Sequence, residues 1–154
     1  MMREVVYYQS PVGVLAIGIE KNVLASIEFT EKATQNSATV SETARQTVMQ
    51  LQEYFESKRT DFNLPLTTKG TEFQQKVWKE LERIPYGESI SYHELARRVG
   101  NEKAYRAVGN ANGKNPICII IPCHRVIQAN GNIGGYAYGS EVKQFLLELE
   151  KQKK

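Results

Sequence analysis

Residues 91–113 read SYHELARRVGNEKAYRAVGNANG, and this stretch decides the fold of the second half of the chain. Ser91 and Glu94 match a capping box, which predicts the start of a short helix. Gly100-Asn101 is a tight turn, and another helix is expected over residues 102–112. Two short helices joined by a glycine turn are the pattern of a helix-turn-helix, although short helix pairs are common in proteins of many other kinds.

The chain on either side of this stretch predicts further helices. Thr71 and Gln74 match a second capping box, and the helix that they open ends at Pro85. Its apolar stripe consists of Phe73, Val77, Trp78 and Leu81. Ser140 caps a final helix over residues 141–151. The inward face of this helix is expected to contain Val142, Phe145, Leu146 and Leu149. Between these helices we expect a buried strand or extended segment, followed by a loop, at residues 117–121 and 128–139.

The first third of the chain has a different pattern. Residues 3–9 and 12–29 are rich in β-branched and aromatic residues and predict a three-stranded meander. A helix is expected over residues 40–57, and residues 58–70 have no clear periodicity. The sequence therefore predicts an α+β fold with two lobes. Residues 1–65 would form a small α/β N-terminal lobe, a short antiparallel sheet plus a helix, and residues 66–154 a helical C-terminal lobe with the helix-turn-helix.

Composition excludes several classes of protein. The chain has 154 residues, 41% hydrophobic and 24% charged, as expected for an ordinary globular protein. No apolar run approaches the roughly 20 residues that a membrane-spanning helix needs, so we expect no membrane partner. The N-terminus lacks the apolar core of a signal peptide. The two cysteines, Cys118 and Cys123, form no disulfide framework and no CxxC pair. We therefore expect a reducing, intracellular, cytoplasmic setting and no metal site.

Charge is distributed unevenly along the chain. Residues 1–65 contain six Lys and Arg against eight Asp and Glu, whereas residues 66–154 contain fourteen against nine. Six basic residues and one acid lie between Arg97 and Arg125. A basic stretch on a nearly neutral chain indicates contact with a polyanion. A solvated surface would give the same pattern, and charge alone does not decide between the two.

The run Ile121-Pro122-Cys123-His124-Arg125 carries the chemistry of a nucleophile. The thiolate is the reactive form of cysteine, and it needs a base or a positive field nearby. His124 can act as that base, through a water where its ring points away from the thiol. A cysteine after an isoleucine run is more often a core residue. That interpretation suits Cys118 well and Cys123 poorly, but local chemistry leaves both open for Cys123.

Five motifs, in this order and spacing, resemble the O6-alkylguanine-DNA alkyltransferases, also called methylated-DNA–protein-cysteine methyltransferases. They are Ile84-Pro85-Tyr86-Gly87-Glu88, Ser91-Tyr92, Arg106-Ala107-Val108-Gly109, Asn115-Pro116 with Ile121 to Val126, and Gly134-Gly135-Tyr136. The resemblance implies the two-lobed fold described above. It also implies direct transfer of an alkyl group from guanine O6 in DNA to a cysteine, with O4-alkylthymine as a further candidate substrate. The transfer needs no cofactor and no metal, and each molecule acts once because a thioether forms.

The resemblance also implies roles for single residues. Cys123 matches the acceptor, His124 the general base that acts through water, and Glu150 the acid that orients this histidine. Without the resemblance, Glu150 would be a surface acid near a lysine-rich tail. Asn115 matches the residue that braces the active-site turn, although it also suits a plain turn before Pro116. The fifth catalytic residue, Tyr92, is placed to help guanine leave as a neutral base.

The expected partner is double-stranded alkylated DNA, bound by a monomer through the minor groove with the damaged base flipped out. Arg106 resembles the arginine that fills the vacated space; a phosphate contact or a surface ion pair is its alternative. The DNA-binding residues are expected to be Tyr92, His93, Asn101, Arg106, Ala107, Gly109 and Ala129. The substrate pocket is expected to include Val126, Tyr136 and Ala137.

Some positions depart from the family pattern. Tyr105 stands where small residues are frequent, which leaves the groove contact in question, and Ala137 stands where serine is frequent. Asn112-Gly113-Lys114 is less bulky than in some relatives and indicates a roomier pocket. Two other functions remain as alternatives. One is a helix-turn-helix module that binds alkylated DNA without transfer, and the other is a cysteine hydrolase that rests on the Cys/His pair alone.

Overall fold

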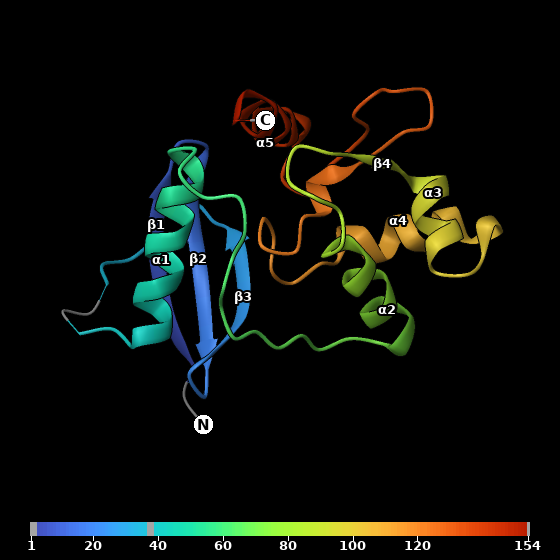
Figure 1. The fold of residues 1–154 in the computed structure, drawn as a ribbon. Helices are drawn as coiled ribbons and strands as arrows, with labels where there is room; N and C mark the ends of the chain where they lie inside the picture. The colour runs from blue at the N-terminus through green and yellow to red at the C-terminus, as the bar shows by residue number, and fades with distance from the viewer. Residues whose placement is uncertain (1–2, 37–38, 154) are drawn as a thin grey trace. The chain divides into compact units, whose positions relative to one another are not determined.

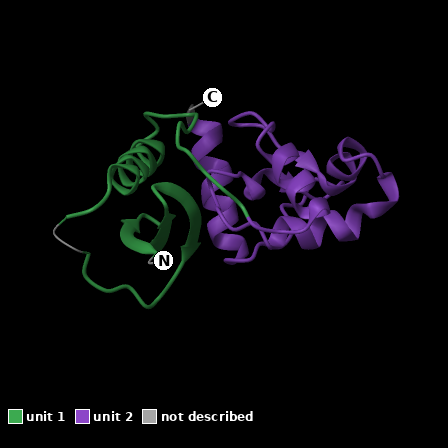
Figure 2. Ribbon diagram, turned by 90° about the horizontal axis from the view of Figure 1, so that it is seen from below, with its two compact units in different colours: residues 1–68 green, residues 69–154 purple. Residues whose placement is uncertain are grey.

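The computed structural model describes residues 3–36 and 39–153, which fold as two compact units, residues 1–68 and 69–154 (Figure 2). Residues 65–67 belong to the first unit because their backbone forms hydrogen bonds with its sheet. The amide of Leu24 donates to the carbonyl of Pro65 at 2.8 Å, and the amide of Thr67 donates to the carbonyl of Leu24 at 2.9 Å. Among the described residues, no helix has both the length and the hydropathy that crossing a membrane requires.

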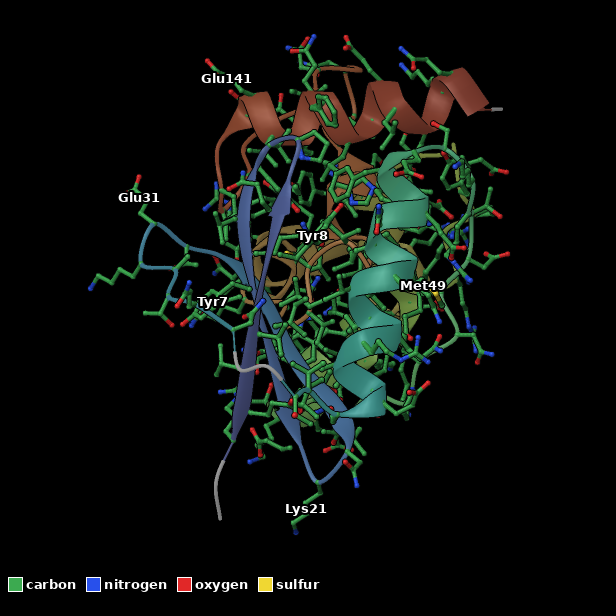
Figure 3. The ribbon with its side chains drawn as sticks, turned by 90° about the vertical axis from the view of Figure 1, so that its left-hand side faces the viewer. Tyr7, Tyr8, Lys21, Glu31, Met49 and Glu141 are labelled. Carbon is green, nitrogen blue, oxygen red and sulfur yellow. The ribbon has the colours of Figure 1, made fainter. Side chains whose placement is uncertain are left out.

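The first unit is a three-stranded antiparallel sheet covered by one helix (Figure 1). Its elements are β1 (Glu4–Ser10), β2 (Gly13–Glu20), β3 (Val23–Phe29) and α1 (Glu42–Phe55). Strand order follows chain order, as a meander requires. Lys21 and Asn22 join β2 to β3 with φ angles of 54° and 65°, the left-handed conformation that a two-residue hairpin turn needs. Figure 3 shows Lys21 at the tip of this hairpin.

The core of the first unit lies between the sheet and α1. Tyr8 faces the helix, and its ring centroid lies 6.4 Å from that of Phe55, whereas Tyr7, the next residue along β1, is on the other face (Figure 3). Leu15, Ile17 and Leu51 are fully buried. This sheet-and-helix unit, together with the helical second unit, confirms the predicted α+β fold.

The second unit contains four α-helices and two short parallel strands within its described residues (Figure 1). Its elements are α2 (Glu72–Leu81), β4 (Ile90–Ser91), α3 (Tyr92–Arg98), the 3-10 turn η1 (Glu102–Ala104), α4 (Tyr105–Gly113), the 3-10 turn η2 (Cys123–Arg125), β5 (Val126–Ile127) and α5 (Ser140–Lys153). The capping box of α2 is complete: Thr71 caps the amide of Gln74, and the Gln74 side chain returns to the amide of Thr71. The indole of Trp78 donates to the carbonyl of Ala111 at 2.8 Å and ties α2 to α4.

Three local predictions were wrong. Only half of the capping box at α3 forms: Ser91 accepts from the amide of Glu94, but the Glu94 carboxylate binds Arg97 and Arg98 instead of returning to the cap. The expected helix over 102–112 is a 3-10 turn followed by α4, because Asn101 caps the amide of Lys103 and tightens the first turn. Residues 117–121 are a largely buried turn, in which Cys118 and Ile121 form an isolated bridge.

Candidate active site

A tight, buried turn presents Cys123. The side chain of Asn115 braces it from both sides: Nδ2 donates to the carbonyl of Ile121 at 2.7 Å, and Oδ1 accepts from the amide of Ile117 at 3.0 Å. Ile119 has a φ of 73°, which a β-branched residue adopts only under strain. Pro122 then forms an inverse γ-turn, in which the amide of Cys123 donates to the carbonyl of Ile121 at 2.8 Å.

Cys123 lies on the wall of a cavity of about 220 Å³. The thiol is nearly buried, 4% exposed, and its Sγ lies 3.6 Å from the hydroxyl of Tyr136. Five further residues expected at the site line the same cavity, namely Tyr92, Gly109, Asn115, Tyr136 and Ala137. Asn112, Gly113, Gly135 and Tyr138 complete the lining. Val126 does not belong to it, since its side chain is fully buried in β5. The lining combines three glycines and an alanine with three tyrosines, side chains suited to contact with a flat ring.

The surroundings of Cys123 keep its thiol protonated at neutral pH. Burial raises the pKa of Cys123, and the hydrogen bonds of Tyr136 and Asn115 and the charge of Lys143 oppose that rise without cancelling it. A neutral buried thiol is a poor nucleophile. The site therefore needs a base that removes the proton when the thiol reacts.

His124, Arg125 and Glu150 form a buried polar cluster, two of whose members follow Cys123 directly in the chain. Nε2 of His124 lies 2.7 Å from one carboxylate oxygen of Glu150. Arg125 donates to both oxygens of the same carboxylate, at 2.8 and 3.0 Å, and to the carbonyl of Ile84 at 2.6 Å. The amide of Gly87 donates to Glu150 at 3.3 Å. At 1% exposure, Glu150 is not the surface acid that the sequence alone suggests.

The charges of this cluster fix the tautomer of His124. Burial raises the pKa of Glu150, but the hydrogen bonds from His124 and Arg125 outweigh it and lower the pKa to about 2, so the carboxylate is ionised. Burial lowers the pKa of His124, and the charges of Arg125 and Lys143 add to this effect, so that the pKa stays below its usual value in spite of Glu150 and the ring is neutral. An ionised carboxylate accepts only, hence Nε2 carries the proton and Nδ1 the lone pair. Nδ1 has no hydrogen-bond partner among the described protein atoms.

Tyr92 and Tyr136 are both proton donors at the cavity. Burial raises the pKa of Tyr92, the neighbouring Cys123 adds to that rise, and a hydrogen bond with Asn112 opposes it. Burial also holds the pKa of Tyr136 well above its usual value. Asn112 in addition donates to the carbonyl of Cys123 at 3.3 Å, which fixes the backbone that carries the thiol.

Sequence reasoning missed two basic residues. Lys143 of α5 is fully buried; its ammonium donates to the carbonyl of Gly135 at 3.1 Å and lies 5.7 Å from the centroid of the Tyr92 ring. Arg125 was counted in the basic stretch that faces a polyanion, but it is 6% exposed and bound to Glu150. The spacing of Lys143, Leu146 and Glu150 puts all three on one helix face and could have revealed the lysine.

The predicted DNA-binding residues lie on and around α3 and α4. Arg106 and Ala107 are exposed on the first turn of α4, and a side chain at Gly109 would touch the Tyr92 ring at 3.8 Å, in the cavity wall. Asn101 and Ala129 are exposed as well. His93 is exposed at the start of α3, where its ring stacks on that of Tyr105. Among the described residues, no His, Cys, Asp and Glu side chains are grouped to hold a metal ion.

Comparison with known proteins covers nearly the whole chain. Residues 72–152 match the model of the 6-O-methylguanine DNA methyltransferase DNA-binding domain, and residues 5–68 match that of the ribonuclease-like domain of the same family. A methylated-DNA–protein-cysteine methyltransferase of Methanosarcina acetivorans is 43% identical over 148 residues, which are 93% of this chain and 95% of the relative. The constitutive Bacillus subtilis protein of the same name is 58% identical over 103 residues, 66% of this chain and 62% of its own.

Solved structures agree with these relatives. The crystal structure of the Mycobacterium tuberculosis O6-methylguanine methyltransferase superposes with a TM-score of 0.90 at 42% identity and covers 99% of this chain and 95% of its own. A Mycobacterium tuberculosis structure of OGT in complex with DNA gives a TM-score of 0.86 at 44% identity and covers 96% of this chain and 92% of its own.

Proposed function

The chain belongs to the 6-O-methylguanine DNA methyltransferase family, and we propose that Cys123 is the residue that takes the alkyl group from the damaged base. The protein repairs alkylated DNA by direct transfer to a cysteine. One observation carries the assignment of Cys123: it lines the cavity, and the next residue in the chain, His124, is buried and bound to Glu150. Cys118, the other cysteine, does not line this cavity.

The proton of the thiol leaves through His124. Because Nε2–H is bound to Glu150, Nδ1 is the basic atom, and a water between Nδ1 and Sγ would carry the proton. Glu150 then stabilises the imidazolium that forms, as the acid does in a Ser-His-Asp triad. Arg125 holds the carboxylate in place and keeps it ionised, so that it cannot take the proton itself.

The thiolate then displaces guanine from the alkyl carbon. A C–S bond forms, the C–O6 bond breaks, and the electron pair of that bond goes to the guanine ring. Tyr92 supplies a proton to the departing base, which leaves as neutral guanine, and the phenol regains its proton from solvent. A thioether has no leaving group of comparable quality, so each molecule reacts once.

The base reaches Cys123 only after it leaves the duplex, because O6 of a stacked guanine cannot enter a recessed cavity. Gly109 lines this cavity and α4 carries it, so the helix that contacts DNA also forms the mouth of the pocket. We place α4 in the minor groove, with Arg106 in the space that the flipped base vacates. Arg106 is exposed and suited to that role.

Mass spectrometry tests the assignment. The protein is incubated with duplex DNA that carries one O6-methylguanine, and the masses of its cysteine-containing peptides are then measured. We expect one added methyl group on Cys123, none on Cys118, and full transfer by a Cys118→Ser variant. Binding of the duplex with no methyl group on the protein would instead support a module that recognises damage without removing it. Turnover on an ester would support the hydrolase.

The same chemistry bears on the location of the protein. Both cysteines are free thiols, and Cys123 must stay reduced to react. We propose that the protein works in the reducing cytoplasm, where disulfides are rare. Localisation of a fluorescent fusion in living cells tests this, and a signal outside the cytoplasm would contradict it.

A further inference from the structure

A second cavity, of about 360 Å³, lies next to the one that holds Cys123. The two are adjacent, because Tyr92 and Gly109 line both of them. The rest of the second lining comes from α3, the start of α4 and the loop after β5, namely His93, Tyr105, Gln128 and Ala129. The alkyl transfer described above gives no role to Tyr105 or Gln128, and His93 and Ala129 enter it only as expected contacts to DNA.

Two stacked rings form one wall of this second cavity. The ring centroids of His93 and Tyr105 lie 4.6 Å apart, with an interplanar angle of 22°. Both side chains are exposed, and Tyr105, at 38%, is one of two large hydrophobic residues that are exposed among the described residues. An exposed tyrosine that a neighbouring ring already holds in place loses little conformational entropy when another flat ring packs on it.

Two basic residues lie close to Tyr105 in the chain. The guanidinium of Arg106 lies 5.9 Å from the centroid of the Tyr105 ring, and Lys103 is exposed in η1, two residues before Tyr105. Aromatic side chains between cations are the arrangement that binds unstacked nucleobases, since the cations hold the phosphates and the ring stacks on the base. The surroundings therefore favour a nucleotide over an apolar ligand.

We propose that His93 and Tyr105 form a stacking subsite for a nucleobase next to the flipped nucleotide. The inference rests on the proposed function, because the duplex opens a base for this subsite only when the damaged nucleotide leaves the stack. Arg106 fills the vacated space from one side, and Tyr105, its neighbour at the start of α4, holds the adjacent base. The pair thus stabilises the open duplex while the lesion occupies the Cys123 cavity.

Base stacking on an aromatic side chain changes affinity by about 5- to 100-fold in proteins that bind single strands. A Tyr105→Ala variant should lose affinity for lesion-containing duplex within this range, whereas Tyr105→Phe, which keeps the ring, should bind like the unmodified protein. Stacking releases no counterions, so the slope of log affinity against log salt should be the same for Tyr105→Ala and the unmodified protein. Lys103→Ala is the matched control and should lower that slope.

Fluorescence locates the base. Three duplexes carry O6-methylguanine and one 2-aminopurine, placed as the 5′ neighbour, as the 3′ neighbour or opposite the lesion. A Cys123→Ser background keeps the complexes unreacted. We expect the fluorescence of 2-aminopurine at one of the three positions to be quenched in the complex with this parent. The Tyr105→Phe variant of the parent should quench it as well, whereas the Tyr105→Ala variant should leave it brighter. Equal fluorescence for Tyr105→Ala and its parent at all three positions would overturn the proposal.

Transfer from free O6-benzylguanine separates this inference from the proposed function. With Cys123 present, Tyr105→Ala should slow transfer from duplex DNA more than transfer from the free base, because only the duplex uses the subsite. Equal slowing on both substrates would show that Tyr105 supports the Cys123 cavity and would overturn the subsite. If the unmodified protein transferred no alkyl group from duplex DNA and none from the free base, the proposed function itself would be refuted.

Discussion

Lys143 is the residue whose burial is hardest to explain by stability. Its side chain is fully buried, and burial lowers its pKa from 10.5 to about 8. The unfolded chain keeps the proton of this lysine up to about pH 10.5, whereas the folded chain keeps it only up to about pH 8. The folded chain therefore binds the proton less tightly. Burial of this charge therefore destabilises the fold at every pH below about 8, by about 3 kcal/mol, and the penalty disappears as pH rises from 8 to 10.5.

The compensation for this penalty is functional, and Lys143→Met separates the two effects. We expect the free energy of unfolding at pH 7 to rise by about 1–3 kcal/mol. The rate of alkyl transfer should fall, because the positive charge that opposes the rise in the pKa of Cys123 is gone. Urea unfolding and single-turnover kinetics measure both. Lys151→Met, an exposed lysine on the same helix, is the control, and a variant at Lys143 that reacts at the normal rate would contradict this role.

The sequence predicts residues of this site to different degrees. Cys123, His124 and Asn115 stand in one stretch that resembles the active-site motif of the family, and this resemblance assigned a role to each before the fold was known. Lys143 stands between Val142 and Gln144 and has the appearance of an ordinary surface lysine. Its burial depends on the tertiary packing of α5, and the one trace of that packing in the sequence is the spacing that puts Lys143 on the same helix face as Leu146 and Glu150.

At the level of elements, the turn before Cys123 depends on Asn115. An Asn115→Ala substitution leaves the amide of Ile117 buried without a partner and the carbonyl of Ile121 with the amide of Cys123 alone, at a cost of roughly 1–3 kcal/mol. We expect this loss in urea unfolding, together with a large loss of alkyl transfer. Asn130→Ala removes a comparable contact to the amide of Asn132 at an exposed loop and should cost less than about 1 kcal/mol. Equal losses at the two positions would contradict the bracing role.

The same turn shows why the prediction of an extended segment at residues 117–121 failed. Isoleucine favours strands, and nothing within the run itself indicates a reversal. The positive φ of Ile119 is imposed by the Asn115 brace on one side and by Pro122 on the other. In contrast, the strands of the first unit and the helices α1, α2 and α5 follow from periodicity and caps, which act locally and can be seen in the sequence.

Substitutions in helix α4 should slow alkyl transfer from duplex DNA much more than transfer from free bases. We expect Arg106→Ala to slow transfer from duplex DNA by about tenfold or more, with a smaller effect on free O6-benzylguanine. Arg106→Lys keeps the charge but loses the flat guanidinium, so it distinguishes insertion from a phosphate contact. Single-turnover rates on both substrates provide the measurement. A lysine variant that reacts with duplex at the normal rate would favour the phosphate contact.

For the molecule as a whole, stability at low pH depends on the same cluster that activates Cys123. Glu150 has a folded pKa of about 2 against 4.5 unfolded, so its ionised form stabilises the fold above pH 4.5, by about 3 kcal/mol, and this contribution is lost as pH falls from 4.5 to 2. The lowered pKa of buried His124 acts in the same direction, since the unfolded chain takes up a proton below pH 6.5 more readily than the folded one.

Acid should therefore unfold the second unit progressively from pH 6.5 downward. Trp78, the single tryptophan of the chain, is buried in α2 and reports on this unit. We expect the urea midpoint, followed by its fluorescence, to fall steadily between pH 7 and pH 3. Glu150→Gln should be less stable at pH 7, because Arg125 loses its charged partner, and should depend less on pH below 4.5. A midpoint that stays constant from pH 7 to pH 4 would mean that the cluster contributes nothing to stability, and the buried carboxylate would then serve the reaction alone.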